Sequence, residues 1–247
     1  MKRALAVAMA LLSATAVAYV IPQFSVLRRL VERRDNLRLT ALRVSGTATF
    51  SDEGAREAAA ALALPAEREI QAQFVISLKP PGRCRADVSA PQGKSSAAVM
   101  AQGRRRVEGT EIPSVSEAIG QICPLLGVRA AGEGEGRAGV ERHLRELGVE
   151  ERQSSLARFD GRIVYVLGKP GPDQPQLWVY KDVFQPARVL YKDGQGRKWD
   201  VRFRDFETGV AGDAFPRIVE VARGEETLVR FTALAADGRG ALADNLF

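Results

Sequence analysis

The chain has 247 residues, a formal net charge of +6, one histidine and two cysteines. One histidine and two cysteines cannot form a four-ligand zinc site without unusual carboxylate help. The sequence also lacks G-x-S-x-G, H-E-x-x-H and a complete phosphate loop, so we expect no enzyme activity, no metal and no cofactor. Carboxylates such as Asp182 and Asp193 leave an exported hydrolase as an open alternative.

The amino terminus has the layout of a secretory signal peptide. Two basic residues precede an apolar run over residues 4–18, which is short for a membrane span and ends in small residues at Ala18. We therefore predict a cleaved signal at 1–18, a single domain at 19–247 and a periplasmic location. Residues 19–21 would lengthen the apolar run, so a retained anchor stays open. Cleavage lowers the net charge from +6 to +4, and this small surplus in an exported protein argues against nucleic-acid binding.

The mature chain begins with an amphipathic helix near Pro22. Its apolar side contains Phe24, Leu27 and Leu30. From Leu37 the hydrophobic period becomes two for about 75 residues, which is typical of consecutive strands. We predict strands at 38–50, 67–79, 83–90, 95–102 and 104–110.

The clearest of these strands is 67–79. Phe74 and Ile76 share its apolar face, while polar residues occupy the other face, as in a half-solvated antiparallel strand. Three consecutive arginines, Arg104 to Arg106, form the densest charged cluster, which we interpret as a solvated strand face.

A helical insert is predicted at about 113–148. Ser114 and Glu117 have the spacing of a capping box at the start of its first helix, and Pro124 is expected to end that helix. A glycine-rich linker and a second helix follow.

Apolar stripes run along both helices of the insert. Ile119 and Ile122 belong to the first stripe, and His143 shares the second stripe with leucine and valine residues. This spacing favours a core or boundary histidine over a catalytic one.

Cys84 and Cys123 are predicted to form one disulfide, because an even number of cysteines in an oxidising compartment favours pairing. The bond would close a loop of about 39 residues, worth on the order of 4 kcal/mol in the chain-entropy model. It would also pin the first helix of the insert to the third strand.

The last hundred residues are predicted to form a meander of strands. Trp199, Val201 and Phe203 alternate with charged residues in one of them, and short turns such as Asp160-Gly161 separate the strands. A meander of this kind forms a sandwich, an open half-barrel or a closed barrel. The strands are expected at 153–159, 161–168, 175–181, 186–193, 197–207, 216–223 and 226–235.

The order of several short motifs resembles the LolA and LolB family of periplasmic lipoprotein carriers and receptors, over nearly the whole mature chain. The motifs are Leu78-Lys79-Pro80-Pro81-Gly82-Arg83-Cys84-Arg85, Gln102-Gly103, Gln176-Leu177-Trp178-Val179, Phe184-Gln185-Pro186, Val189-Leu190-Tyr191 and Asp244-Asn245-Leu246-Phe247. At Pro80 this sequence departs from the arginine with which the family's carrier holds its lid.

The resemblance implies a mainly antiparallel β fold with helices (α+β), in which a curved, unclosed half-barrel sheet is covered on its concave face by helices. It also implies binding of acyl chains, from a lipid or an acylated lipoprotein destined for the outer membrane. The candidate lid residues are Phe24, Leu27, Leu30, Ile119 and Ile122, and the candidate wall residues are Phe74, Ile76, Trp199, Val201 and Phe203.

Two alternatives stay open beside this expectation. Apolar stripes of this kind are also ordinary core, so each candidate residue has a purely structural interpretation. An envelope-stress sensor of the same fold would instead bind a membrane-protein partner, without carrier activity. In either case we expect a monomer.

Overall fold

The computed structural model describes residues 21–129, 136–150 and 152–247, so the predicted signal peptide lies outside the described residues. None of the described helices has the length and hydrophobicity needed to cross a membrane. The elements are α2 (Gln23–Asn36), β1 (Leu42–Ser51), α3 (Asp52–Leu62), β2 (Glu69–Lys79), β3 (Arg83–Ser89), β4 (Ser95–Ala101), β5 (Arg104–Glu108), α4 (Pro113–Leu126), α5 (Gly136–Glu146), β6 (Ser154–Phe159), β7 (Arg162–Leu167), β8 (Gln176–Tyr180), β9 (Pro186–Lys192), β10 (Lys198–Arg204), η1 (Gly212–Ala214), β11 (Ile218–Arg223), β12 (Glu226–Asp237) and η2 (Asp244–Leu246).

The strands form one 12-stranded antiparallel sheet in the order β5-β4-β3-β2-β1-β12-β11-β10-β9-β8-β7-β6. Neighbours in the sheet are neighbours in the chain, except where β1 pairs with β12. The sheet is unclosed, with β5 and β6 at its two edges. The predicted strands of both halves are present, with small differences at their ends.

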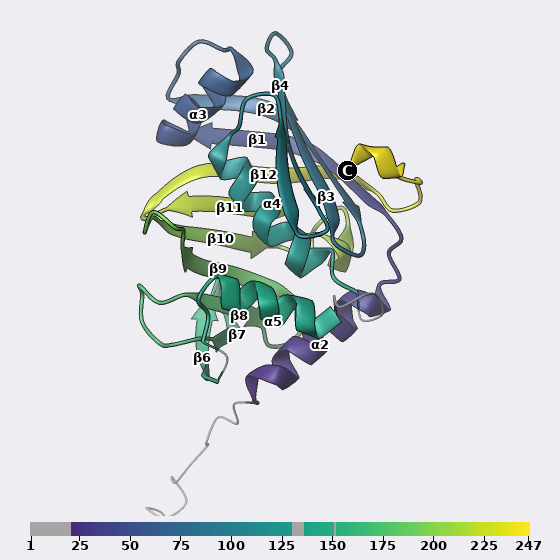
Figure 1. The fold of residues 1–247 in the computed structure, drawn as a ribbon, viewed down its shortest axis with the longest axis vertical. Coiled ribbons are helices and arrows are strands. Elements are labelled where there is room, and N and C mark those ends of the chain that lie inside the picture. Colours follow the sequence, from purple (N-terminus) through teal and green to yellow (C-terminus); the bar gives the residue numbers. More distant parts are fainter. Residues whose placement is uncertain (1–20, 130–135, 151) are drawn as a thin grey trace, which may run out of the picture.

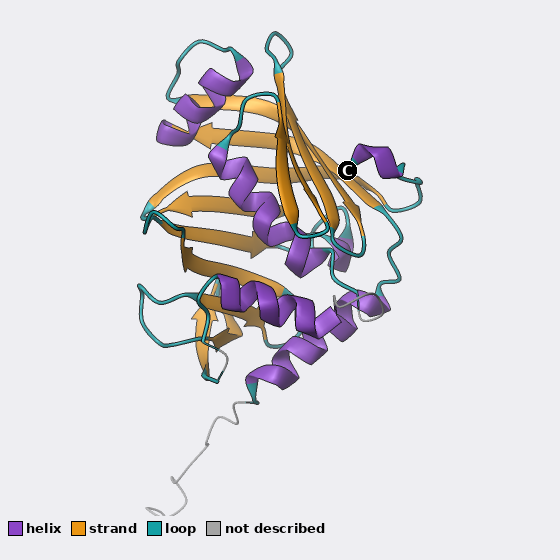
Figure 2. Cartoon of the chain, viewed as in Figure 1, coloured by secondary structure: helices purple, strands orange, loops and turns teal. Residues whose placement is uncertain are grey.

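The sheet curves strongly around helix α4 (Figures 1 and 2). Strands β3 and β4 pack against one side of α4, and β10 to β12 pack against the other side. Helices α5 and α2 continue this cover and contact each other, while α3 packs on β1, β2 and β12. The predicted α+β half-barrel with helices on its concave face is confirmed.

The expectation that a period of two continues for about 75 residues after Leu37 was wrong, because Asp52–Leu62 is the helix α3. This segment is rich in alanine, the best helix former. Asp52 and Glu53 lie in its first turn, where negative charge is favourable. Ala58 and Leu62 are buried, so the helix covers one end of the concave face.

Two expectations about α4 were also wrong. The helix continues through Pro124 to Leu126, because only its last turn follows the proline and the Gly127 N–H still donates to the Cys123 carbonyl at 3.0 Å. Ser114 forms no capping box: Ile112 is the N-cap residue, and Pro113 occupies the first turn, where a missing N–H costs little.

Candidate functional site

The five candidate wall residues all lie on the concave face of the sheet. Register explains this placement: Val201 of β10 pairs with Val189 of β9 and with Val221 of β11, so the inward rows of adjacent strands coincide. These wall residues are at most 1% exposed: Phe74, Ile76, Trp199, Val201 and Phe203. They form the floor of what we call the concave groove.

Four of the five candidate lid residues are buried against this groove. Ile119 and Ile122 of α4 and Leu27 and Leu30 of α2 are each 0% exposed. Phe24 is 51% exposed and does not belong to this buried set. Helix geometry explains the difference, because Phe24 lies on the flank of the stripe that Leu27 and Leu30 share.

A cavity of about 170 Å³ lies between the end of α4 and helix α5. The turns that connect β2 with β3 and β4 with β5 line it through Gly82 and Gly103, and Met100 adds an apolar wall. Val140 and His143 line it from α5. Unfilled space therefore lies beside α5, the described α-helix with the fewest buried residues.

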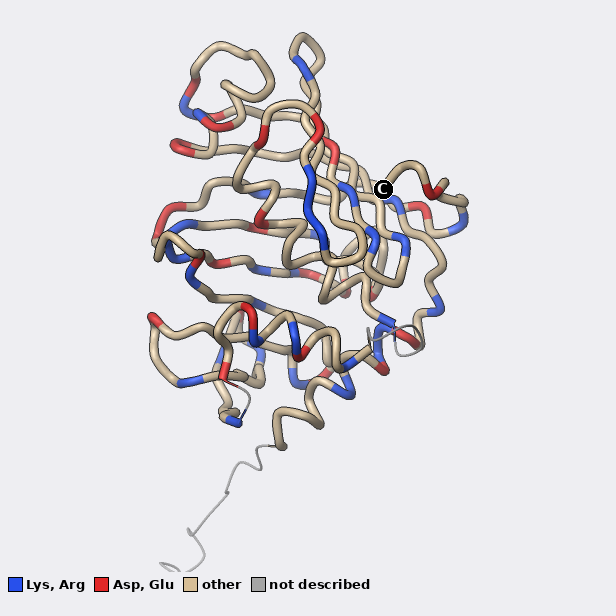
Figure 3. Tube along the Cα trace, viewed as in Figure 1, with Lys and Arg blue, Asp and Glu red and all other residues tan. Residues whose placement is uncertain are grey.

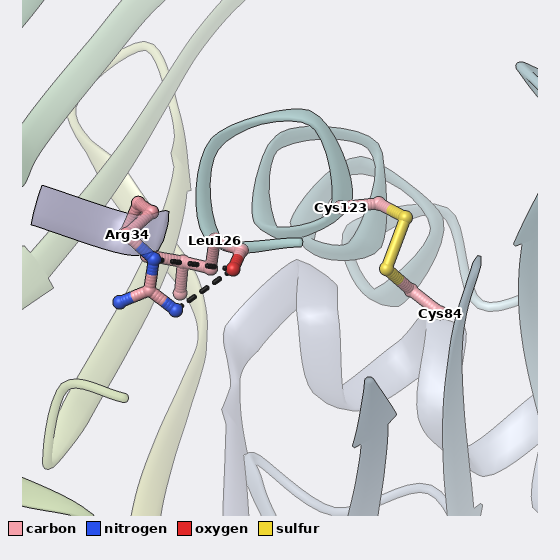
Figure 4. Close-up of a disulfide and its surroundings, with 4 residues drawn as sticks. All are labelled: Arg34, Cys84, Cys123 and Leu126. Atoms are coloured by element: carbon pink, nitrogen blue, oxygen red, sulfur yellow. Dashed lines mark hydrogen bonds between the residues drawn. A yellow bond between two sulfur atoms is a disulfide. The ribbon is translucent and has the colours of Figure 1, made fainter. Parts of the chain in front are cut away.

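The predicted disulfide between Cys84 of β3 and Cys123 of α4 is confirmed (Figure 4). Both cysteines are buried. The bond lies beside the cavity, whose lining includes Cys123. It ties the carboxyl-terminal half of α4 to the sheet, so this part of the cover cannot swing away while the bond is intact.

The side chain of Arg34 fastens α2 to the rest of the cover (Figure 4). It is 3% exposed, and its Nη2 donates to the carbonyl oxygens of Leu126 at 2.7 Å and of Ala214 at 2.8 Å. Its Nη1 donates to the Asp213 carbonyl at 2.9 Å, and the neighbouring Arg33 pairs with the Asp213 carboxylate. We call Arg33, Arg34, Leu126, Asp213 and Ala214 the Arg34 cluster.

Within the described part of the chain, Arg34 pairs with no carboxylate. Its acceptors are carbonyl oxygens, including Leu126 O at the carboxyl end of α4, where helix carbonyls lack intrahelical partners and the helix dipole is negative. Burial, and then repulsion from Arg33, lower the pKa of Arg34 to about 9. The guanidinium is therefore charged at neutral pH but poorly compensated.

The sequence-based search for site residues missed Arg34. It follows Arg28, Arg29 and Arg33 in the sequence and therefore resembles a solvated helix position. However, Arg34 lies seven residues after Leu27 and four after Leu30, which places it on the same stripe. An arginine on the apolar side of a helix was the available signal.

A polar network connects α4 with α5, β9 and β5. The ring Nε2 of His143 lies 2.8 Å from Gln121 Oε1. One turn earlier on α4, Glu117 accepts the Tyr191 hydroxyl at 2.5 Å and pairs with Arg105 at 3.0 Å. Burial lowers the pKa of His143 to about 4, and burial next to Glu117 raises the pKa of Tyr191. The predicted core or boundary position of His143 is confirmed.

The wall residues of the groove and four of the lid residues are apolar and closely packed. Among the described residues, no group of three or more His, Cys, Asp or Glu side chains could hold a metal ion. The polar groups of the Arg34 cluster and of the His143 network bind helices to each other and to the sheet. They surround the groove and do not line its floor.

Comparison with known proteins identifies the fold. No family model matches the chain, and no curated protein matches it by sequence. Among solved structures it is similar to a LolA superfamily protein from Nitrosomonas europaea, at 15% identity and a TM-score of 0.51, covering 92% of this chain and 98% of that one. It is also similar to a DUF1329 family protein from Desulfovibrio piger, at 12% identity and a TM-score of 0.49, covering 92% and 98%. A putative outer membrane lipoprotein-sorting protein domain from Vibrio parahaemolyticus matches at 11% identity and a TM-score of 0.46, covering 90% and 96%. The chain therefore has a LolA-like fold.

Proposed function

We propose that this chain is a periplasmic lipid- or lipoprotein-binding protein that accepts acyl chains in the concave groove. The observation that carries the proposal is that the concave face of the unclosed sheet is apolar and is covered by helices, not by further strands. An acyl chain can take the place of the helices' apolar side chains on this face, because each methylene group that it buries contributes about 0.8 kcal/mol to binding. The LolA-like fold agrees with this function.

The groove would open at α2 and α5, not at α4. The disulfide ties α4 to β3, whereas α2 is held at its end by the hydrogen bonds of the Arg34 cluster. Displacement of α2 would uncover Leu27 and Leu30, and displacement of α5 would enlarge the cavity. The Arg34 cluster would then hold the lid closed in this chain. It lies elsewhere in the fold than Pro80, the position that matches the lid-holding arginine of the family's carrier.

The cavity volume favours a second candidate function, a partner-binding envelope protein without carrier activity. The cavity of about 170 Å³ is close in size to an engineered apolar cavity of about 150 Å³ that binds ligands as small as benzene or xenon. With the helices in place, this cavity therefore has no room for a long acyl chain. If the helices stay closed, the buried stripes are core, and the outer surface would provide the binding site.

Uptake of a fluorescent fatty acid by detergent-free protein distinguishes the two functions. We expect the mature protein to bind the probe, and native mass spectrometry of periplasmic material to show co-purified lipid. Arg34→Met should accelerate uptake about tenfold, because it removes the hydrogen bonds that hold α2. Arg28→Met is the matched control, since Arg28 lies on the same helix with its side chain 58% exposed.

Absence of probe uptake by the wild-type protein and by folded Arg34→Met would contradict the carrier function and favour the second candidate. Equal acceleration by Arg28→Met would contradict the assignment of the Arg34 cluster as the fastening, while leaving lipid binding intact.

A further inference from the structure

The two edges of the sheet differ in how they are protected. At the β6 edge, the chain that enters α2 lies against the first residue of the strand, because Ser154 Oγ donates to the Ile21 carbonyl at 3.2 Å. At the β5 edge, the side chains of Arg104, Arg105 and Arg106 are exposed. An open sheet edge presents unpaired backbone groups on which another strand can form.

The hairpin geometry shows which backbone groups of β5 are available. Gln102 and Gly103 form a two-residue turn with positive φ values of 52° and 72°, and Ala101 pairs with Arg104. In such a hairpin the pair that flanks the turn exchanges hydrogen bonds, and every second pair does so as well. The N–H and C=O groups of Arg105 and Val107 therefore point away from β4. Within the described chain, no other backbone group bonds to them.

The charge of this edge is not fully neutralised by the described residues. Arg105 pairs with Glu117 at 3.0 Å and Arg106 with Glu108 at 2.5 Å, but Glu108 also pairs with Arg85 at 2.8 Å. Arg104 has no acidic partner within the described chain. Figure 3 shows the three arginines as a blue run along the strand that follows the β4–β5 turn, beside α4.

These arginines determine which strand can pair with β5. Antiparallel pairing of β5 with a second copy of itself through Arg105 and Val107 would set Arg106 opposite Arg106 but Arg104 opposite Glu108, so the charges of two β5 strands are only partly complementary. An acidic strand would place carboxylates opposite Arg104 and Arg106 on one face and Arg105 on the other. The edge is therefore better matched to an acidic strand than to a second copy of β5.

We propose that β5 is the docking edge for an acidic, extended segment of a partner protein, which adds to the sheet as a further strand. The backbone groups of Arg105 and Val107 supply the hydrogen bonds, and the three arginines supply the selectivity. This interaction does not depend on the concave groove and is independent of lipid binding.

The test uses a short synthetic peptide in which glutamate alternates with valine, and a matched peptide with lysine in place of glutamate. Fluorescence anisotropy at low salt should show binding of the glutamate peptide alone. Val107→Pro should weaken binding about tenfold, because it removes one outward N–H without breaking a bond to β4. Leu156→Pro places the same change at the equivalent hairpin position of β6 and should leave binding unchanged.

Charge reversal provides the complementary measurement. The double variant Arg104→Glu and Arg106→Glu keeps the strand and should transfer binding to the lysine peptide. The proposal is overturned if the wild-type protein binds neither peptide, if Val107→Pro binds as tightly as the wild type, or if the reversed variant still prefers glutamate. Arginine-dependent binding to anionic vesicles that Val107→Pro does not weaken, without binding of the glutamate peptide, would also overturn it, because a lipid surface needs no strand pairing.

Discussion

Arg34 and His143 are basic side chains that the fold removes from water, and burial lowers the pKa of each. The pKa of Arg34 falls to about 9 and that of His143 to about 4. Arg34 therefore stays charged around neutral pH and depends on carbonyl oxygens for compensation. His143 is neutral there, so the charge at the α4–α5 contact changes only when the pH falls to about 4, and Arg34 is then unaltered.

Stability should fall as the pH drops from about 6.5 towards 4, through the protonation of His143. Its pKa is about 4 in the folded protein and 6.5 in the unfolded chain, so the unfolded chain binds more protons in this window. The contribution is below about 4 kcal/mol, at 1.36 kcal/mol for each of about 2.5 pKa units. Urea unfolding from pH 4 to 8 measures it.

His143→Gln is the control, because glutamine keeps a polar partner for Gln121 and does not titrate. Carboxylates with lowered pKa values, such as Asp193 and Asp244, also stabilise the folded protein less as the pH falls. Only the difference between the two profiles therefore reports on His143. Parallel profiles for wild type and variant between pH 4 and 6.5 would contradict the assignment.

At the scale of elements, two glycines in helices have opposite surroundings. A Cβ atom added at Gly120 of α4 would meet nothing within 4 Å, whereas one added at Gly54 of α3 would lie 1.9 Å from the Leu228 carbonyl oxygen. Gly120→Ala should therefore raise the free energy of unfolding by about 1 kcal/mol, the difference in helix propensity.

Gly54→Ala should instead lower it by about 2 kcal/mol or more, because α3 must move away from β12. Thermal unfolding of both variants, with circular dichroism to confirm the helices, measures the contrast. A loss of stability in Gly120→Ala would mean that the space beside α4 is not free.

The local hydrophobic pattern predicted most helices and strands, but not the helix α3 between two strands or the end of α4. Alternation identified the strands around Phe74 and Val201, because side chains on a half-buried sheet alternate between two faces. It failed for α3, where alanine suits a buried face in either structure. The end of α4 depends on how Pro124 lies in the last turn, and the role of Arg34 depends on carbonyls about ninety and one hundred and eighty residues away. Such partners are set by tertiary contacts that no sequence window contains.

At the scale of the whole molecule, the cover over the groove is uneven. Almost every residue of α4 is buried, whereas only Gly136, Val140 and Leu144 of α5 are. The disulfide adds a covalent tie to α4 alone, so the three helices α2, α4 and α5 divide into a fixed part, α4, and a more easily displaced part, α5 with α2. A closed sheet could open only if hydrogen bonds between its strands broke. The groove of this unclosed sheet can open if α5 and α2 alone move.

Hydrogen exchange should show this division directly. In the oxidised protein, we expect α5 amides to exchange through local opening and α4 amides only through global unfolding, because deeply packed helices open last. Reduction of the Cys84–Cys123 bond releases a loop of 39 residues and should cost on the order of 4 kcal/mol. Exchange in the carboxyl-terminal half of α4 should then accelerate strongly, while α5 exchanges by the same local opening as before. If α4 and α5 exchanged together before and after reduction, the cover would be one cooperative unit, and opening at α2 and α5 alone would be wrong.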